Sequence, residues 1–291
     1  MWLRSFTSWG GHPSGRDDAT SAGHPGRSNE DFVGAVPRAA VLLDGAGIPG
    51  TESICHHGVA WYTHRLGGAL LGRLSADDDR DLSSVLADAI DQLAAEHRHT
   101  CGIADPSSPQ ATVALMRVDS ERAEYLVLAD SYVLLGAPAD NSVVVTDGRE
   151  VAVRRSCLAL LDGLEAGSPA YDAARETAIG ALRARRNQPG GYWIAKDDPR
   201  AAEEAVTGAV PLADLTRLAL LSNGAARVIE PYRLATWSTL LNLCQDNGPA
   251  EVLRLLREHE ASLSFGAGIS TVDPDDATVA YCISLQPPDM P

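Results

Sequence analysis

The feature that most constrains the fold of this chain is the grouping of its helical and extended patterns. Apolar residues recur at steps of three and four residues over 55–74 and again over 82–93, which predicts two consecutive helices. Short β-rich segments separated by polar turns then follow one another at 111–118, 124–128, 132–135 and 142–145. Helices grouped together and strands grouped together predict an α+β architecture with an antiparallel meander, and they exclude a doubly wound parallel sheet.

The remaining elements extend this pattern to both ends of the chain. Further strands are expected within 2–9 and at 32–35, 39–43, 215–221 and 277–284, and further helices at 171–186, 232–244 and 249–260. There is no internal repeat, and no stretch has the composition of a linker. We therefore expect a single domain over residues 1–291, whose informative motifs span about 29–284.

Charge and cysteine content limit the classes of function. The chain carries 24 lysines and arginines against 39 aspartates and glutamates, a formal net charge of −15, so nucleic acid and anionic membrane surfaces are not expected partners. It has no apolar run of membrane-spanning length and no secretory signal, which predicts a cytoplasmic protein. The five cysteines are scattered without a C-x-x-C pair, which predicts reduced thiols instead of disulfides or a zinc site.

Acidic residues stand where strands end or turns begin, at widely separated points of the chain. They are Asn29-Glu30-Asp31, Asp44-Gly45, Ala129-Asp130-Ser131 and Asp275-Asp276. Carboxylates at the ends of strands can converge although they are distant in sequence, and Mg²⁺ and Mn²⁺ prefer such oxygen ligands. Any one of these motifs alone is a common turn sequence. Together they predict a site for divalent cations.

The order of these motifs resembles that of the metal-dependent protein phosphatases of type 2C (the PPM family). Ser222-Asn223-Gly224 follows an apolar strand between the third and fourth acidic motifs, and Asp275-Asp276-Ala277-Thr278-Val279 opens the last strand. The resemblance covers nearly the whole chain. It implies two antiparallel β-sheets sandwiched between helix pairs, and a phosphoserine or phosphothreonine phosphatase that uses two Mn²⁺ or Mg²⁺ ions and acts on a phosphorylated protein.

The resemblance also implies a role for each motif residue. Asp44 would bridge the two metal ions, and Glu30 with the carbonyl group of Gly45 would complete the site of one of them. Asp275 would bind the other ion, and Asn223 stands where the family has an aspartate. The metal-bridging water would then attack phosphorus in line.

The other acidic residues and one arginine take supporting roles. Asp31 and Asp276 would hold the ligand residues in place without binding a metal, and Asp130 would approach a weaker third ion. The phosphate-binding arginine of the family falls on Gly26 here, and Arg27 is the neighbouring residue that could substitute for it.

Several positions depart from the family pattern. Asn223 removes one negative charge from the predicted metal site. Ala46 follows Asp44-Gly45, so no histidine is available there as a proton donor, and His57 is the alternative candidate. Ile48 and Ala129 each replace a glycine. These departures keep open a second reading, a catalytically weakened phosphatase-like module that binds or regulates phosphoproteins; the oligomeric state stays open as well.

Two further patterns allow other interpretations. Gly45-x-Gly47-x-x-Gly50 matches a dinucleotide-binding fingerprint, but Asp44 would place an anion beside the pyrophosphate and no second strand follows at the required distance. An oxidoreductase is therefore a minor alternative. Tyr192-Trp193 is expected either to pack on the core or to line a substrate cleft.

Overall fold

The strands form two antiparallel sheets that pack face to face. The computed structural model describes residues 3–7, 17–24, 28–47, 50–51, 53–76, 79–139, 141–266 and 274–283, with the backbone alone for 3–7 and 264–266. One sheet has the order β1 (Leu3–Thr7), β2 (Asp18–Ala22), β11 (Ala277–Cys282), β10 (Arg217–Leu221), β7 (Tyr132–Gly136) and β8 (Ser142–Thr146). The other has the order β3 (Phe32–Val36), β4 (Ala39–Ala46), β5 (Gln110–Val118), β6 (Arg122–Leu128) and β9 (Val206–Pro211).

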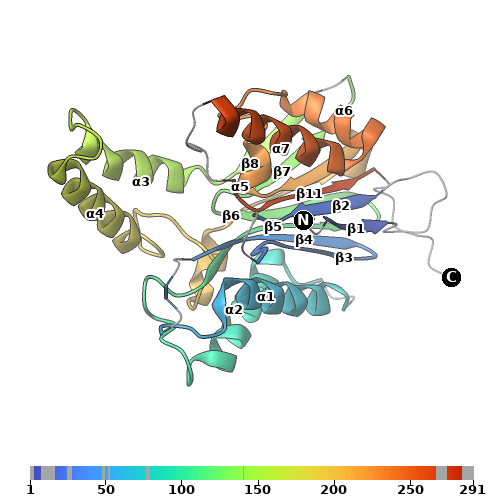
Figure 1. Cartoon of the computed structure of the whole chain (residues 1–291). Helices are drawn as coiled ribbons and strands as arrows, with labels where there is room; N and C mark the ends of the chain where they lie inside the picture. Colours follow the sequence, from blue (N-terminus) through green and yellow to red (C-terminus); the bar gives the residue numbers. More distant parts are fainter. Residues whose placement is uncertain are drawn as a thin grey trace.

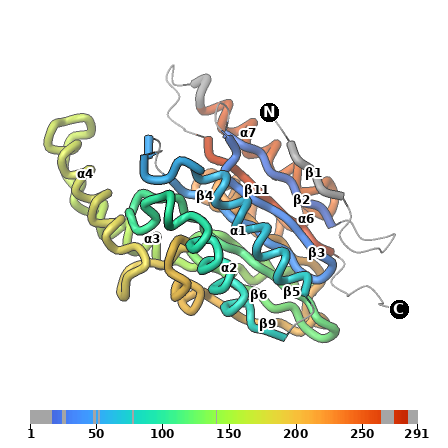
Figure 2. The backbone as a smooth tube through the Cα atoms, turned by 90° about the horizontal axis from the view of Figure 1, so that it is seen from below, coloured from blue at the N-terminus to red at the C-terminus, as the bar shows by residue number. Residues whose placement is uncertain are grey.

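A pair of helices covers the outer face of each sheet (Figure 1). The five-stranded sheet carries α1 (Gly58–Leu74) and α2 (Leu82–His97), which lie across its strands in Figure 2. The six-stranded sheet carries α6 (Trp237–Asn247) and α7 (Pro249–Gly266). A short helix, α5 (Asn223–Ala226), follows β10, while α3 (Arg149–Leu158) and α4 (Pro169–Ala184) project from one side of the sandwich. This is the predicted architecture.

Alternation along the strands divides the core into three layers. In β4, Val41 and Leu43 face the α1–α2 layer, whereas Ala40 and Leu42 face the opposite sheet. All four side chains are buried, because a strand in the middle of such a sandwich has an apolar layer on each side. The strand therefore reads as a continuous apolar run until it ends at the site-forming Asp44.

The predicted meander is wrong in one respect, because it is divided between the two sheets. Strands β5 and β6 pair in the five-stranded sheet, and β7 and β8 pair in the six-stranded sheet. The chain crosses between the sheets at Ala129-Asp130-Ser131, where Ala129 has a φ of 62°. This left-handed conformation is one that glycine adopts without steric penalty, which explains why a glycine would suit this position.

Several elements were not expected from the sequence, among them the short helix α5. Strand β2 has few large apolar residues, and three of its residues are buried where it pairs with β1 and β11. Helix α3 has no amphipathic pattern, and β9 is a short edge strand, interrupted by Gly208 and ended by Pro211, that pairs with β6. The helix expected over 232–244 begins later, at Trp237, because the Thr236 side chain accepts a hydrogen bond from the Thr239 amide and caps it there.

The strand pairing also decides between the fold alternatives. Strand β4, which precedes the glycine-rich turn, is antiparallel to both of its neighbours, β3 and β5. A dinucleotide-binding unit requires parallel strands at this point, so the oxidoreductase alternative is contradicted. Within the described residues, no helix has both the length and the apolar character needed to cross a membrane.

Two adjacent glycines of α1 give a test of how this helix packs on β3. A Cβ atom at the buried Gly67 would lie 2.2 Å from Cδ1 of Phe32, whereas a Cβ at Gly68 would meet nothing within 4 Å. We expect Gly67→Ala to lower the free energy of unfolding by about 1 to 3 kcal/mol through overpacking. Gly68→Ala should raise it by about 0.5 to 1 kcal/mol through helix propensity. Urea denaturation of both variants measures this, and equal effects of the same sign would contradict the packing.

Candidate functional site

The acidic motifs meet at one end of the sandwich, where the loops of both sheets come together. The backbone N–H of Asn223 donates a hydrogen bond of 3.1 Å to the Asp44 carboxylate, and its side-chain Nδ2 donates one of 2.8 Å to Asp130. Asp44 lies near the end of a strand of one sheet, Asn223 follows a strand of the other, and Asp130 lies on the crossing between them. Residues 93 and 179 positions apart in the sequence are thus joined by hydrogen bonds in one cluster.

Two glycines allow the loops to approach this closely. A Cβ atom at Gly45 would lie 2.4 Å from the backbone oxygen of Glu30, and one at Gly224 would lie 1.9 Å from the backbone oxygen of Asp276. Neither contact leaves room for a side chain. The Gly45 contact brings the end of β4 against Glu30, and the Gly224 contact brings α5 against the segment before β11.

Asp276 organises the segment that carries Glu30. Its two carboxylate oxygens accept hydrogen bonds from the backbone N–H groups of His24 at 2.6 Å and of Glu30 at 2.7 Å. The residue is 4% exposed. Both of its oxygens are engaged by the backbone, so Asp276 fixes the loop before β3.

Asp31 joins the same loop to the six-stranded sheet through hydrogen bonds that begin at β11. Its Oδ2 accepts a hydrogen bond of 2.6 Å from the Thr278 hydroxyl, which is also 2.7 Å from the Ser21 hydroxyl. The Thr278 backbone N–H in turn donates to the Ser222 hydroxyl at 2.9 Å. Through this buried chain, a carboxylate beside β3 holds β2, β11 and the residue before Asn223 in a fixed arrangement.

The cluster concentrates negative charge in a buried place. Burial, with repulsion from Asp31, Asp130 and Asp275, raises the pKa of Asp44 well above its ordinary value. Burial raises the pKa of Asp31 to about 7 and that of Asp130 to about 6, and neighbouring carboxylates add to both effects. The ionised cluster is therefore unfavourable by itself, and a cation among these groups would relieve the repulsion.

The side chains fit a hard divalent cation. The available donors are carboxylate and amide oxygens, which are the ligands of Mg²⁺ and Mn²⁺. Asp31 Oδ1 is buried and has no hydrogen-bond partner within the described residues. Asp275, on the rim, has 41% of its side chain exposed, so one side of the cluster faces solvent. A substrate could approach from that side.

Three arginines near the cluster were missed by the sequence reasoning. Arg227 donates to the Asp275 carboxylate at 2.9 Å, and Arg257 donates to the backbone oxygen of the same residue. Arg154 on α3 pairs with Glu150, whose charge contributes to the raised pKa of Asp130. The spacing of four residues between Asn223 and Arg227 could have indicated the first contact, but nothing in the sequence places Arg257 or Arg154.

The other residues singled out in the sequence differ in where they lie in the structure. Arg27, the candidate phosphate ligand, and Ile48 lie outside the described residues. His57 lies among cysteines, and burial with the nearby His56 and His97 lowers its pKa, which does not favour a proton donor. Tyr192 and Trp193 are buried, and Trp193 belongs to the core beneath α1 and α2, which confirms the core-packing interpretation.

Comparison with known proteins identifies the fold. No family model matches the sequence, and no curated protein matches it significantly. Among solved structures, the chain is similar to the serine/threonine phosphatase Stp1 of Staphylococcus aureus, with 13% identity, a TM-score of 0.57, and coverage of 97% of this chain and 95% of that one. It is also similar to PppA, a regulatory component of the type VI secretion system of Pseudomonas aeruginosa, with 16% identity, a TM-score of 0.56, and coverage of 96% and 99%.

A third similar structure is the catalytic domain of the serine/threonine protein phosphatase PstP in complex with two manganese ions. It has 18% identity, a TM-score of 0.54, and coverage of 97% of each chain. These similarities extend over nearly the whole of each chain compared. The chain therefore has the fold of the type 2C phosphatases, as the sequence motifs predicted.

Neighbouring aspartates at the start of β11 should differ sharply in their contribution to stability. We expect Asp276→Ala to lower the free energy of unfolding by about 3 kcal/mol, because it leaves the buried N–H groups of His24 and Glu30 without their charged acceptor. Asp275→Ala removes a solvent-exposed ion pair and should change it by less than about 1 kcal/mol. Denaturation in the presence of a chelator makes the comparison, and a larger loss for Asp275→Ala would contradict the assigned roles.

Proposed function

We propose that this protein is a metal-dependent phosphomonoester hydrolase that acts on phosphoserine or phosphothreonine in proteins. The observation that supports it most is the convergence of Asp44, Asp130, Asn223 and Asp275 at the open end of a sandwich with the phosphatase fold. A cluster of carboxylates that repel one another is poorly suited to binding a phosphate directly. It is well suited to holding the cations that would bind one.

The residues divide into ligands and supports. Asp44 lies at the centre, where the charges of Asp31, Asp130 and Asp275 all act on it, so it is the residue we assign to bridging two ions. Gly45 lies against Glu30, and we assign Glu30 and the carbonyl group of Gly45 to one of these ions. Asp275 and Asn223 are assigned to the other, and Asp130 is assigned to a third, weaker ion.

Mn²⁺ or Mg²⁺ is the proposed cofactor. When bound, two such ions would make a water molecule nucleophilic at neutral pH and offset the charge that develops on the phosphoryl oxygens. The chain's own part is to fix the ligands. Asp31 and Asp276 hold the loop of Glu30, and the Thr278–Ser222 contact holds the start of α5. Such positioning restricts the site before the substrate arrives.

A phosphoprotein-binding module without turnover is the second candidate. Two hydrogen bonds favour it. The side-chain amide of Asn223 donates to the Asp130 carboxylate, and the Arg227 guanidinium donates to the Asp275 carboxylate. Each donor takes a carboxylate oxygen that a metal would otherwise bind. Arg227 also gives the exposed rim a positive charge that a phosphate could contact. The PppA similarity is compatible with either function, since that protein is described as a regulatory component.

Hydrolysis of an aryl phosphate during a Mn²⁺ titration separates these functions. We expect metal-dependent turnover in the unchanged protein and a loss of at least about 100-fold in Asp44→Asn, because the bridging carboxylate is removed. Asp246→Asn, an exposed residue near the end of α6, is the matched control and should keep full activity. Turnover that survives Asp44→Asn would contradict the assigned ligand. Phosphopeptide binding without turnover at saturating Mn²⁺ would instead establish the binding module.

Position 223 should couple metal binding to stability. In a chelator, Asn223→Asp should lower the free energy of unfolding by about 1 to 2 kcal/mol, because a carboxylate replaces the donor to Asp130. With Mn²⁺ present the additional charge should tighten binding by about tenfold, and the ordering of melting temperatures should reverse.

The control for this variant is Asn141→Asp, an exposed position in the β7–β8 turn. It makes the same change of charge away from the cluster, so it should alter neither metal affinity nor the order of melting temperatures. A Mn²⁺ titration followed by calorimetry measures both variants. An unchanged affinity in Asn223→Asp would show that position 223 does not bind the metal.

A further inference from the structure

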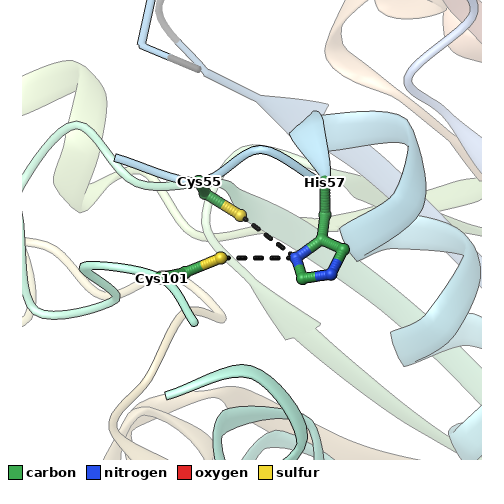
Figure 3. Close-up of side chains that lie close together, drawn as sticks. All are labelled: Cys55, His57 and Cys101. Carbon is green, nitrogen blue, oxygen red and sulfur yellow. Dashed lines mark hydrogen bonds between the residues drawn. The ribbon is translucent and has the colours of Figure 1, made fainter. Parts of the chain in front are cut away.

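A second group of metal-binding side chains lies at the start of α1, apart from the acidic cluster. Figure 3 shows Cys55, His57 and Cys101 with both sulfur atoms directed at one ring nitrogen of the histidine. Cys101 Sγ lies 3.3 Å from His57 Nδ1, and Cys55 Sγ lies 3.8 Å from it. This group could not be predicted from the sequence, because 44 residues separate His57 from Cys101.

The distances within this group are those of ligands around one ion. A tetrahedral Zn²⁺ has Zn–S bonds of about 2.3 Å and Zn–N bonds of about 2.1 Å, which places sulfur and nitrogen ligands about 3.6 Å apart. The two measured separations lie on either side of this value. The ligand atoms of all three residues lie within 4.8 Å of one another, so a single ion could contact each of them.

Hydrogen bonds to His57 Nδ1 cannot serve both thiols at once. A neutral imidazole nitrogen that accepts has one lone pair, so only one of the two thiols can donate to it with good geometry. The other contacts of Cys101 Sγ are longer, at 3.7 Å from His56 Nδ1 and 3.7 Å from the Thr100 hydroxyl. A metal ion placed between the three atoms would contact both sulfurs and the nitrogen together.

The surrounding structure holds these side chains in place. Cys55 is 4% exposed, and the His57 ring stacks on Trp61 with centroids 4.1 Å apart. The backbone N–H of Gly102 donates to the carbonyl oxygen of Ile54 at 2.8 Å, which ties the loop before α1 to the loop after α2. The two cysteines therefore approach each other through fixed backbone, as a preformed site requires.

We infer that Cys55, His57 and Cys101 form a Zn²⁺ site that fastens the start of α1 to the loop after α2. Two thiolates and one imidazole are soft and borderline ligands, which favour zinc over the Mg²⁺ or Mn²⁺ of an oxygen site. The exposed His56, whose Nδ1 lies 3.7 Å from Cys101 Sγ, lies outside this group of three and would have to move to supply a fourth ligand. Binding releases the two thiol protons to solvent as two Zn–S bonds form.

The position of this site suggests a structural role for the ion. Val59, two residues after His57, lies over the glycines that follow Asp44: a Cβ at Gly45 would be 2.7 Å from its Cγ1 and one at Gly47 would be 2.2 Å from its Cγ2. A zinc ion that fixes the first turn of α1 would therefore also fix the wall behind the proposed phosphatase site. It would take no part in the hydrolysis itself.

Cobalt substitution of the full chain tests the site without relying on enzyme activity. Chelator-treated, reduced protein is titrated with Co²⁺ and then with Zn²⁺. We expect a sulfur-to-cobalt charge-transfer band that saturates at one Co²⁺ per chain and disappears when Zn²⁺ displaces it. An oxygen-ligand site gives no such band, so Asp44→Asn should leave it unchanged. A missing band in the folded, unchanged protein would overturn the inference.

Matched cysteine variants assign the ligands. Cys101→Ser should weaken Zn²⁺ binding at least about 100-fold in competition with a chromophoric chelator, whereas Cys157→Ser, a buried cysteine on α3, should bind as before. Circular dichroism checks that both variants fold, and His57→Ala gives a second ligand variant. Equal affinities in Cys101→Ser and Cys157→Ser would overturn the site, and so would a Cys55–Cys101 disulfide whose reduction yields no zinc binding.

Discussion

The repulsion among the carboxylates that meet at one end of the sandwich is the constraint on which the site depends. Asp31, Asp44 and Asp130 all have raised pKa values because burial disfavours their charged forms and each acts on its neighbours. The fold tolerates this because backbone N–H groups and hydroxyl groups reach several of the oxygens, and because the rim is open to water at Asp275. A cluster of ionised carboxylates costs free energy without a cation and is stabilised when a cation binds. This behaviour is characteristic of a metal-binding site.

The hydrogen bonds around this cluster show two different uses of polar groups. Asp276 and Thr278 connect loops and strands, and their partners are backbone N–H groups, buried hydroxyls and the Asp31 carboxylate. Asn223 and Arg227 instead contact carboxylates that a metal would bind. The first group maintains the geometry of the site, and the second determines how strongly the chain's own donors compete with a cation.

Much of the fold and the site could be predicted from the sequence, for identifiable reasons. The long stripes of α1 and α2 and the apolar run of β4 have strong periodicity, and the motifs Asp44-Gly45 and Asp275-Asp276 stand at strand ends that the fold brings together. Strand β2 was missed because pairing, not composition, buries it. Arg257 and the Cys55–Cys101 approach were missed because contacts between distant loops leave no periodic trace in the sequence.

The crossing of the chain at Ala129-Asp130-Ser131 has a consequence for the cooperativity of unfolding. Asp130 lies on that crossing, and the other residues of the cluster come from both sheets: Asp31 and Asp44 from the five-stranded sheet, and Asn223 and Asp275 from the six-stranded one. An ion held by residues of both sheets would link the two sheets at one end. The apolar side chains packed between the sheets link them elsewhere. The two halves of the sandwich could then not separate without releasing the ion, so loading the site would make the layers unfold as a single thermodynamic unit.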